Sequence, residues 1–460
     1  MSIVYTGIIN HYRHIHKRLF CSATVHTRRK IRSKIDMALK SRENPIVIKL
    51  DTPEFKAIFS QEVNDLKALF DKYQYEIRVA GGAVRDLLMG MQPKDLDFAT
   101  TATPQQMKDM FTAENIRMIN SNGEKHGTIT PRINDKENFE VTTLRIDMIT
   151  DGRHAEVEFT TDWKLDANRR DLTINSMFLG FDGSVYDYFF GYEDLQKKRI
   201  AFVGDPDIRI KEDYLRIMRY FRFYGRIAEC PDNHEEKTLN VIKENAAGLQ
   251  QISGERIWVE LKKMLQGNFA GNLLKTMINI GIGEYIGLPS SPDLEELDKV
   301  LKRAEHLKLH PMSYLAALLK DFDKVTILHN RLKFSSYERD MAYFIVEHRE
   351  DKVSEKPLQP YEKLVLNTKI KQKDAVEYVR EVLKYRGEEI LLENFDKWEI
   401  PRFPINGKIL KDAKVPPGKM YGPIINKLKD IWIEGDYEQT SDDLVKFIPS
   451  IIEAFENKKK

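Results

Sequence analysis

The spacing of apolar residues divides this 460-residue chain into a mixed first part and a helical remainder. Apolar residues recur at helical spacing across 51–72, with Thr52 and Pro53 as N-cap and first helical residue, so we predict one helix there. Short runs bounded by turn residues predict strands at 76–80, 95–99, 139–145, 155–161 and 185–189. From about residue 192 the pattern is helical almost to the end, without the strand–helix alternation of a doubly wound sheet. The predicted fold class is α+β, a small mixed sheet followed by helices.

Two short motifs within the predicted sheet favour phosphate and metal chemistry. Gly81 and Gly82 follow the strand at 76–80 and precede a helix, where a backbone without side chains can approach a phosphate closely. Asp95 and Asp97 are two residues apart on a predicted strand, so their carboxylates project from the same face. Two carboxylates on one rigid face are what two Mg²⁺ ions need in phosphoryl transfer. Either motif alone is common in turns, but their order along the chain predicts a nucleotidyltransferase site.

Further candidates for this site have two interpretations each. Glu140, in the predicted strand 139–145, is either a third carboxylate of the site or a cross-strand partner for an arginine. Arg170 is either a ligand of the triphosphate or ribose, with Asp171 and Asn175 holding its loop, or part of a polar connection between a strand and a helix. Residue types alone favour neither interpretation.

A basic and aromatic segment forms a second constellation. Residues 212–226 predict one helix ending near Gly225, in which Asp213 and Arg216 are neighbours on one face. A basic stripe continues along the helix through Arg219, Arg222 and Arg226. In most proteins such a stripe is a salt-bridged surface. Beside a phosphate site, arginines on a largely apolar helix would find their anionic partner in a bound triphosphate.

The Asp213 and Arg216 pair has the donor and acceptor groups to select a base. Cytosine and adenine both present an exocyclic amine beside a ring-nitrogen acceptor, and these match a carboxylate beside a guanidinium. Uracil and guanine present a carbonyl oxygen in place of the amine and an N–H in place of the ring-nitrogen acceptor. Each such mismatch with the carboxylate or the guanidinium weakens binding by roughly 1–3 kcal/mol. The pair would therefore choose C and A over U and G without a nucleic-acid template.

Composition narrows the class of protein. The chain is 42% apolar and 31% charged, and no run of 18 or more apolar residues indicates a membrane span. Its two cysteines give neither a disulfide framework nor zinc-ligand spacing, which favours a reducing compartment. The sequence does not specify an oligomeric state.

The N-terminal segment differs from the rest of the chain. The first 35 residues hold eight Lys or Arg and no acid, which is typical of a mitochondrial transit peptide, so we predict one at 1–36. A basic disordered arm is the alternative. Met37 follows as a start for a shorter cytoplasmic or nuclear form. Without these 35 residues the chain carries 65 basic and 71 acidic side chains, a net charge of −6 against +2 for the whole. Any RNA contact must therefore come from local basic patches.

The motifs together resemble those of the class II tRNA nucleotidyltransferases, the CCA-adding enzymes and their bacterial-type poly(A) polymerase relatives. The matching segments are GGAVRDLL (81–88), KDLDFAT (94–100), RRDLTINSM (169–177), GYEDL (191–195), EDYLRIMRYFRF (212–223) and SGERIWVELKKML (253–265). The amino-acid sequences of segments 122–129 and 151–157 are also similar to those of animal mitochondrial members of the family.

The resemblance implies an architecture and an activity. A polymerase-beta-like head would occupy 51–190, a helical neck with the base-reading helix 191–270, a helical body 271–350 and a helical tail 351–460. The body and tail would hold the acceptor arm of tRNA, and a flexible loop around 146–154 would help to switch from C to A. The implied activity is template-independent addition of CCA to the 3′ end of tRNA from CTP and ATP, with release of pyrophosphate.

The resemblance also implies residue roles. Asp95 and Asp97 would be catalytic and hold two Mg²⁺ ions. Nucleotide binding would fall to Gly82, Arg85, Arg170, Asp213, Arg216, Arg219 and Arg222. Two rival interpretations remain: a poly(A) polymerase of the same superfamily, and a non-catalytic RNA-binding protein with a degenerate transferase head.

Overall fold

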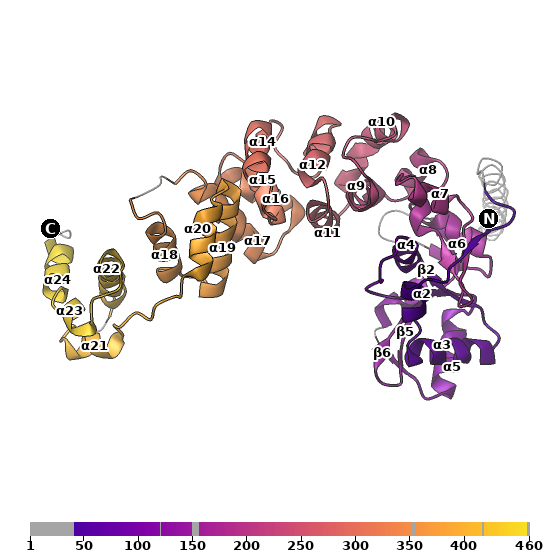
Figure 1. The fold of residues 1–460 in the computed structure, drawn as a ribbon, viewed down its shortest axis with the longest axis horizontal. Coiled ribbons are helices and arrows are strands. Elements are labelled where there is room, and N and C mark those ends of the chain that lie inside the picture. Colours follow the sequence, from indigo (N-terminus) through magenta and orange to yellow (C-terminus); the bar gives the residue numbers. More distant parts are fainter. Residues whose placement is uncertain (1–40, 120, 150–155, 352–354, 416–417, 458–460) are drawn as a thin grey trace, which may run out of the picture. The chain divides into compact units, whose positions relative to one another are not determined.

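The computed structural model divides into two compact units along the chain, one ending at Ile252 and the other starting at Ser253 (Figure 1). The structure describes residues 41–119, 121–149, 156–351, 355–415 and 418–457. The predicted transit peptide at 1–36 and Met37 lie outside these described residues. Within them, no helix combines the length and apolar character that crossing a bilayer requires.

A mixed sheet forms the centre of the first unit. Its strands and a separate two-stranded pair are β1 (Ile46–Lys49), β2 (Ile77–Ala80), β3 (Asp97–Thr100), β4 (Arg117–Ile119), β5 (Thr128–Ile133), β6 (Glu137–Asn138), β7 (Glu140–Thr143), β8 (Arg145–Ile149), β9 (Glu156–Phe159), β10 (Phe178–Leu179) and β11 (Ser184–Tyr186). The strand order in the sheet is β1-β11-β10-β2-β3-β7-β5-β4, with β6 paired to β5 and β8 paired to β9. Of these pairs β3–β7 is parallel and the others are antiparallel.

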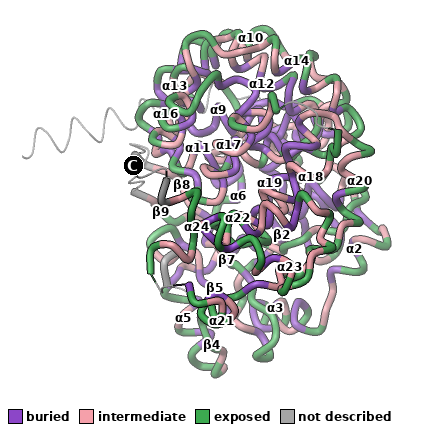
Figure 2. The backbone as a smooth tube through the Cα atoms, turned by 90° about the vertical axis from the view of Figure 1, so that its left-hand side faces the viewer, coloured by how far each residue is buried: buried purple, intermediate pink, exposed green. Residues whose placement is uncertain are grey.

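Helices complete the first unit. They are α2 (Pro53–Ala57), α3 (Gln61–Lys72), α4 (Gly82–Leu88), α5 (Pro104–Ala113), η1 (Ser121–His126), α6 (Trp163–Arg169), η2 (Thr173–Asn175), α7 (Gly191–Gln196), α8 (Pro206–Glu212), α9 (Leu215–Ile227), α10 (Glu236–Asn245) and η3 (Ala246–Gln251). Helix α9 is buried over most of its length, as its tube in Figure 2 shows. The sheet followed by helices confirms the predicted α+β class.

The single helix predicted over 51–72 is wrong, because the chain forms two. Thr52 and Pro53 begin α2 as expected, and Thr52 accepts a hydrogen bond from the backbone N–H of Phe55. The helix ends at Ala57, and Ser60 then caps α3 by accepting from the N–H of Val63. Apolar periodicity continues through the junction, which is why the sequence pattern does not show it.

The strand predictions hold in part. Segments 76–80 and 155–161 contain β2 and β9, while 139–145 divides into β7 and the start of β8. Strand β8 occupies 145–149 and pairs with β9, so the predicted loop 146–154 begins as a strand. Residues 150–155 lie outside the described part.

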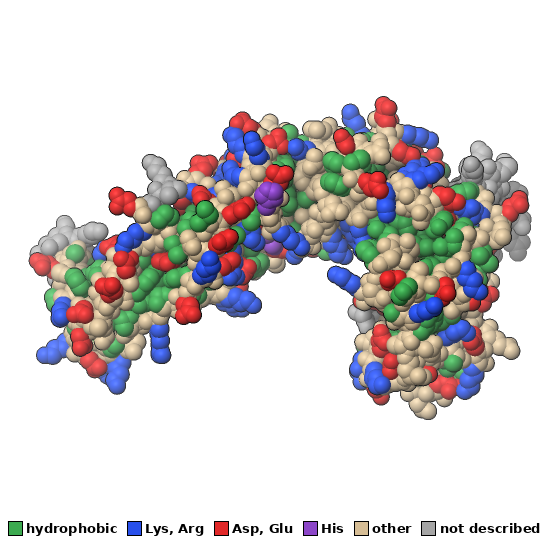
Figure 3. All heavy atoms as spheres, in the orientation of Figure 1, with side chains coloured by type: hydrophobic (Ala, Val, Ile, Leu, Met, Phe, Trp, Pro, Cys, Tyr) green, Lys and Arg blue, Asp and Glu red, His purple; other side chains and the backbone are tan. Residues whose placement is uncertain are grey.

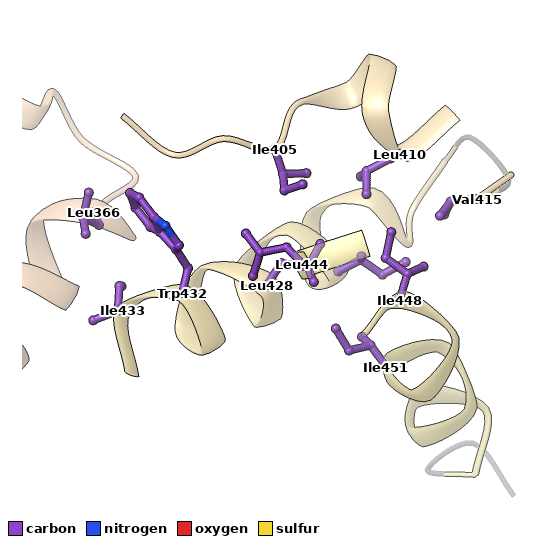
Figure 4. Packing of buried hydrophobic residues seen from close by; sticks show 11 residues of the cluster. Leu366, Ile405, Leu410, Val415, Leu428, Trp432, Ile433, Leu444, Ile448 and Ile451 are labelled. Atoms are coloured by element: carbon purple, nitrogen blue, oxygen red, sulfur yellow. The ribbon is translucent and has the colours of Figure 1, made fainter. Parts of the chain in front are cut away.

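The second unit is helical throughout its described residues. Its helices are α11 (Gly254–Leu265), α12 (Ala270–Asn279), α13 (Ile282–Tyr285), α14 (Leu294–Arg303), α15 (Pro311–Ala317), α16 (Phe322–Leu332), α17 (Ser336–His348), α18 (Gln359–Leu366), α19 (Gln372–Arg386), α20 (Glu389–Lys397), α21 (Gly407–Asp412), α22 (Tyr421–Glu434), α23 (Ser441–Val445) and α24 (Ile448–Asn457). Toward the C-terminus, Trp432 and Leu428 of α22 pack with Ile405, Leu444 and Leu366 in one buried cluster (Figure 4). This part of the chain therefore has an apolar core of its own.

Phe98 anchors the middle of the sheet in the first unit. It is 1% exposed and follows Asp97 directly. Its ring lies edge-on to Phe139 at 5.6 Å and stacks on Phe181 at 6.1 Å. Packing at this position therefore fixes where the start of β3 lies.

Phe98→Ala should lower the free energy of unfolding of the first unit by about 3–5 kcal/mol, because the sheet cannot close over the cavity left behind. The measurement is urea denaturation followed by hydrogen–deuterium exchange of β2 and β3 peptides. Ile208→Ala is the matched control, since Ile208 is 46% exposed and its truncation should change stability by no more than about 0.5 kcal/mol. Equal urea midpoints for the two variants would contradict the assignment.

Candidate active site

Three carboxylates meet where β3 and β7 begin. Asp97 is the first residue of β3 and stands in parallel register with Glu140, the first residue of β7. Asp95 lies in the bend before β3, so the prediction of a strand over 95–99 is wrong at its start. The partner strand β2 pairs with Phe98 through Val79 and then turns away at Gly81, which leaves the residues before Asp97 without a ladder partner on that side. Asp95 and Asp97 still line one cavity together with Glu140.

The charges of these carboxylates act on one another. Partial burial, followed by the negative charges of Glu140 and Asp95, raises the pKa of Asp97, while Arg170 opposes the rise. Among the described residues, Glu140 forms no ion pair with an arginine, and the neighbour that its register gives it is Asp97. The cluster is therefore short of positive charge.

The donor set fits Mg²⁺ as a partly water-ligated ion. Carboxylate oxygens are the hard ligands that Mg²⁺ prefers, and the ion usually keeps several waters beside one or two carboxylates and substrate phosphates. Across the described segments, no three His, Cys, Asp or Glu side chains form a ready-made metal cage. Asp95 and Asp97 could supply two protein oxygens and leave the remaining positions to water and phosphate.

The glycine turn and the loop after α6 lie against each other. Gly81 has φ +65°, a left-handed conformation that favours glycine, and a Cβ there would come within 3.1 Å of the Nη1 atom of Arg170. Asp166 holds Arg170 by accepting from its Nε at 3.2 Å and its Nη2 at 3.0 Å. Arg170 also donates to the backbone carbonyl of Asn175 at 3.2 Å. Gly82, the first residue of α4, directly follows the glycine that lies against this guanidinium, and a Cβ on Gly82 would lie 3.7 Å from Nη2 of Arg85.

Arg85 is a buried link between α4 and the same loop. Its side chain is 3% exposed, and burial lowers its pKa although Asp86 opposes the fall. It donates to Asp86 Oδ1 at 2.8 and 3.0 Å and to Asn175 Oδ1 at 2.6 Å. Asp86 accepts a further bond from Arg226 at 2.8 Å. The direct phosphate contact expected of Arg85 stays a prediction; its observed partners give it a positioning role.

Three of the predicted phosphate ligands converge on one aromatic ring. The guanidinium carbons of Arg222, Arg85 and Arg219 lie 4.6, 5.0 and 5.4 Å from the ring centre of Phe223. Arg219 also pairs with Asp171 of the loop. Helices α9 and α4 therefore bring three cations to one place, and the loop after α6 adds the carboxylate of Asp171 beside them. A bound anion would further relieve the mutual repulsion of these cations.

Asp213 is not on the base-reading helix, so the prediction of one helix over 212–226 is wrong. Helix α8 ends at Glu212, Asp213 is extended with φ −153° and ψ 106°, and α9 begins at Leu215. The carboxylate of Asp213 accepts from the N–H of Leu215 at 3.1 Å. The ring of Tyr214 lies so close to Gly248 that a Cβ there would come within 2.0 Å of it. This packing fixes the break between the two helices.

Arg216 is oriented by groups other than Asp213. It is 8% exposed and donates to Glu212 Oε2 at 2.5 Å. It also donates to the carbonyls of Arg209 at 2.9 Å and Arg169 at 3.0 Å. Glu212 and Arg209 are not among the predicted site residues, although the i,i+4 spacing of Glu212 and Arg216 indicates that these two side chains can meet on one helix face.

The GYEDL segment supports the arginine loop. A Cβ on Gly191 would come within 2.1 Å of the carbonyl oxygen of Thr173. Thr173 in turn donates from its hydroxyl to Asp194 at 2.6 Å. This explains why a motif without evident chemistry accompanies the site.

Comparison with known proteins gives the class first. The family model described as the poly A polymerase head domain matches residues 77–201, and that of a probable RNA and SrmB-binding site of polymerase A matches 234–300. The Bacillus stearothermophilus CCA-adding enzyme, solved in complex with CTP, shares the fold with a TM-score of 0.65 and 25% identity over 89% of this chain and 100% of its own. The chain is thus a nucleotidyltransferase of the poly(A) polymerase head type.

The curated relatives narrow the class to one family. The human mitochondrial CCA tRNA nucleotidyltransferase 1 is 51% identical, and the Danio rerio protein of that name 52%, each over 87% of this chain and 93% of its own. The CCA-adding enzyme of Lactococcus lactis subsp. cremoris MG1363 is 31% identical over 83% and 94%. The chain belongs to the CCA tRNA nucleotidyltransferase family.

Asp97→Asn should raise the thermal unfolding midpoint at pH 7 in EDTA. Because the pKa of Asp97 is raised on folding, the ionised carboxylate disfavours the folded state above that pKa. This cost fades as pH falls toward the unfolded value near 3.9, so the gain should shrink there. Thermal scans between pH 4 and 8 measure it. Glu158→Gln, at an exposed acid of β9, is the control, and an equal or pH-independent gain would contradict the charge assignment.

Proposed function

We propose that this chain adds CCA to the 3′ end of tRNA from CTP and ATP, without a nucleic-acid template. The observation that carries the proposal is the carboxylate cluster of Asp95, Asp97 and Glu140, with Arg170 near enough to lower the pKa of Asp97, in a chain 51% identical to a mitochondrial CCA tRNA nucleotidyltransferase. Structures of related enzymes with CTP, ATP and tRNA-CCA fit the same substrates.

The reaction is an in-line displacement at phosphorus. The oxygen of the tRNA 3′-hydroxyl forms a bond to the α-phosphorus of the nucleotide, and its proton passes to water. The bond between the α-phosphorus and the oxygen that bridges it to the β-phosphorus breaks, and pyrophosphate leaves. Asp95 and Asp97 would hold two Mg²⁺ ions. When bound, Mg²⁺ lowers the pKa of the hydroxyl and neutralises phosphate charge.

The remaining groups act by position and charge. Gly82 lets the backbone of α4 approach the triphosphate, and Arg170, held by Asp166, supplies a fixed cation beside it. Arg219 and Arg222 bind phosphate from α9, on the side where their guanidinium groups gather around Phe223. Preorganised charges of this kind stabilise a transition state without reorganising during the reaction.

Base choice rests on Asp213 and Arg216. A guanidinium has five N–H donors, and three hydrogen bonds to described residues fix the orientation of Arg216 without using all five. Asp213 follows α8 directly and so presents its carboxylate from a different backbone segment. A carboxylate and a held guanidinium remain the pair that suits cytosine and adenine.

Local cations serve RNA binding. On the face seen in Figure 3, Lys and Arg are interspersed with Asp and Glu over each unit, so contact with tRNA falls to particular basic groups rather than a uniform basic surface. The matched RNA-binding model spans 234–300, which covers parts of the proposed neck 191–270 and body 271–350. The tail 351–460 would complete the grip on the acceptor arm.

The protein is proposed to act in mitochondria. The relatives from human, mouse and zebrafish are named as mitochondrial, and the basic segment 1–36 has the composition of a transit peptide. A form starting at Met37 would lack that segment and remain in the cytoplasm or nucleus.

Product length separates CCA addition from poly(A) synthesis. A tRNA lacking its last three nucleotides is incubated with each NTP alone, and then with CTP and ATP together. The incubation with both CTP and ATP should add two C and one A. An unbounded run of A would instead support the poly(A) polymerase alternative.

Asp97→Ala and Asp95→Ala should each reduce addition of both nucleotides by at least about 100-fold, because each removes a charge that stabilises the transition state. Steady-state incorporation from labelled CTP and ATP measures the loss, and a gel-shift assay should show unchanged tRNA binding. Glu158→Gln should retain activity. Near-normal turnover in either alanine variant would overturn the catalytic assignment.

Asp213→Ala should reduce the preference for CTP and ATP over UTP and GTP by about tenfold or more, because one mismatched contact is worth roughly 1–3 kcal/mol. Single-nucleotide incorporation with each NTP gives the ratios. Asp232→Ala, at an exposed acid after α9, is the matched control. Unchanged ratios in Asp213→Ala would exclude it as a base reader.

A further inference from the structure

A cavity of about 800 Å³ adjoins the carboxylate cluster. This size lies within the roughly 300–1,000 Å³ of small-molecule sites. Its walls come from the junction of α2 and α3, from the loop 92–97, and from β4, β5, β6 and the start of β7. The phosphate-binding candidates Gly82, Arg85 and Arg170 are not among its lining residues. The cavity is therefore a second compartment of the site.

The strand order places this compartment on the far side of the carboxylates from the glycine turn. Strands β3 and β7, which begin with Asp97 and Glu140, lie between β2 on one side and β5 and β4 on the other. Strand β2 leads into the Gly81 turn. Strands β5 and β4 supply Thr130 and Ile119 to the cavity wall. The sheet thus separates a triphosphate side from an opposite side.

In-line displacement requires two such sides. The attacking hydroxyl must approach the α-phosphorus opposite to the leaving pyrophosphate. With the triphosphate over Gly82 and Arg170, the 3′ end of the acceptor must approach from the side of β7 and β5. We propose that this cavity receives the terminal ribose of the acceptor RNA and that Lys94 positions the phosphate on the 5′ side of that ribose. This inference rests on the proposed function, because it presupposes an acceptor RNA.

The chemistry of the wall suits that occupant. Ser60, Gln92, Thr130 and Asn138 offer uncharged donors and acceptors of the kind that ribose hydroxyls need. Ile58 and Ile119 give apolar surface for the sugar ring. These groups favour a neutral polar ligand over an anion.

Lys94 has a distinct place in that wall. Of the described lining residues it alone is basic, whereas Asp95, Asp97, Glu137 and Glu140 are acidic. A phosphodiester entering the cavity would be repelled by these carboxylates everywhere except near Lys94. The lysine is exposed and precedes Asp95 directly, so a phosphate held there lies one residue from the catalytic carboxylates. Lys94 is therefore a positioning residue for the acceptor, not for the nucleotide.

The test is a double-mutant cycle in which one change removes the charge of Lys94 and the other removes the charge of one phosphate of the RNA. The acceptor is a tRNA without CCA in which an uncharged methylphosphonate replaces the phosphate 5′ to the terminal nucleotide. Lys94→Gln should lower kcat/KM for unmodified tRNA about tenfold, with KM for CTP unchanged, since a charged contact is lost. The methylphosphonate should lower kcat/KM of the wild-type enzyme about tenfold but lower kcat/KM of Lys94→Gln less than about twofold. Lys94→Arg should restore activity on unmodified tRNA.

Controls separate the two hypotheses. Lys49→Gln, an exposed lysine on the opposite edge strand β1, should behave as wild type, as should a methylphosphonate placed several linkages upstream. Absence of CTP incorporation by the wild-type enzyme would reject the proposed function itself. Two results with an active wild-type enzyme would overturn the role of Lys94 while leaving the proposed function intact. In the first, the effects of Lys94→Gln and of the methylphosphonate on kcat/KM simply multiply. In the second, Lys94→Gln raises KM for CTP.

Discussion

The parallel pairing of β3 with β7 is the constraint on which the site depends. It places Asp97 and Glu140 side by side at the same ends of neighbouring strands, although they are far apart in sequence. The loss of solvent around Asp97 raises its pKa, and the repulsion between two carboxylates so placed raises it further. The sheet holds them there because Phe98 fixes the next residue in the core. The fold thus holds an excess of negative charge at the start of β3 and β7, which a bound cation would neutralise.

The positive side of the site has the opposite construction. Its arginines come from α4, the loop after α6 and α9, and each of the three groups is held by acidic or amide partners: Arg85 by Asp86, Arg170 by Asp166, and Arg219 by Asp171. These partners keep guanidinium groups in place that would otherwise repel one another. A bound triphosphate would therefore meet donors whose orientation is already set.

Local patterns in the sequence predict the fold class better than the geometry of the site. The α+β class and the strand before the glycines follow from such patterns, as does the position of Asp95 and Asp97 on one cavity. The metal chemistry of these two carboxylates stays a prediction. The start of β3 does not follow from local patterns, because it depends on where its partner β2 turns away. The break at Asp213 depends on Tyr214 packing against Gly248, 34 residues later in the chain. The partner of Arg85 lies at Asn175, 90 residues away. Such long-range contacts leave no periodic trace in a single sequence.

Asn175 has a further consequence for how this protein can change over time. Its side-chain oxygen accepts from Arg85 and its backbone oxygen from Arg170, while Asp86 joins Arg85 to Arg226. Loss of any one side chain among Arg85, Asp86 and Asn175 strands a buried polar group of another. A change at one of these three positions would therefore lower the stability of the folded protein unless its hydrogen-bond partner changed as well.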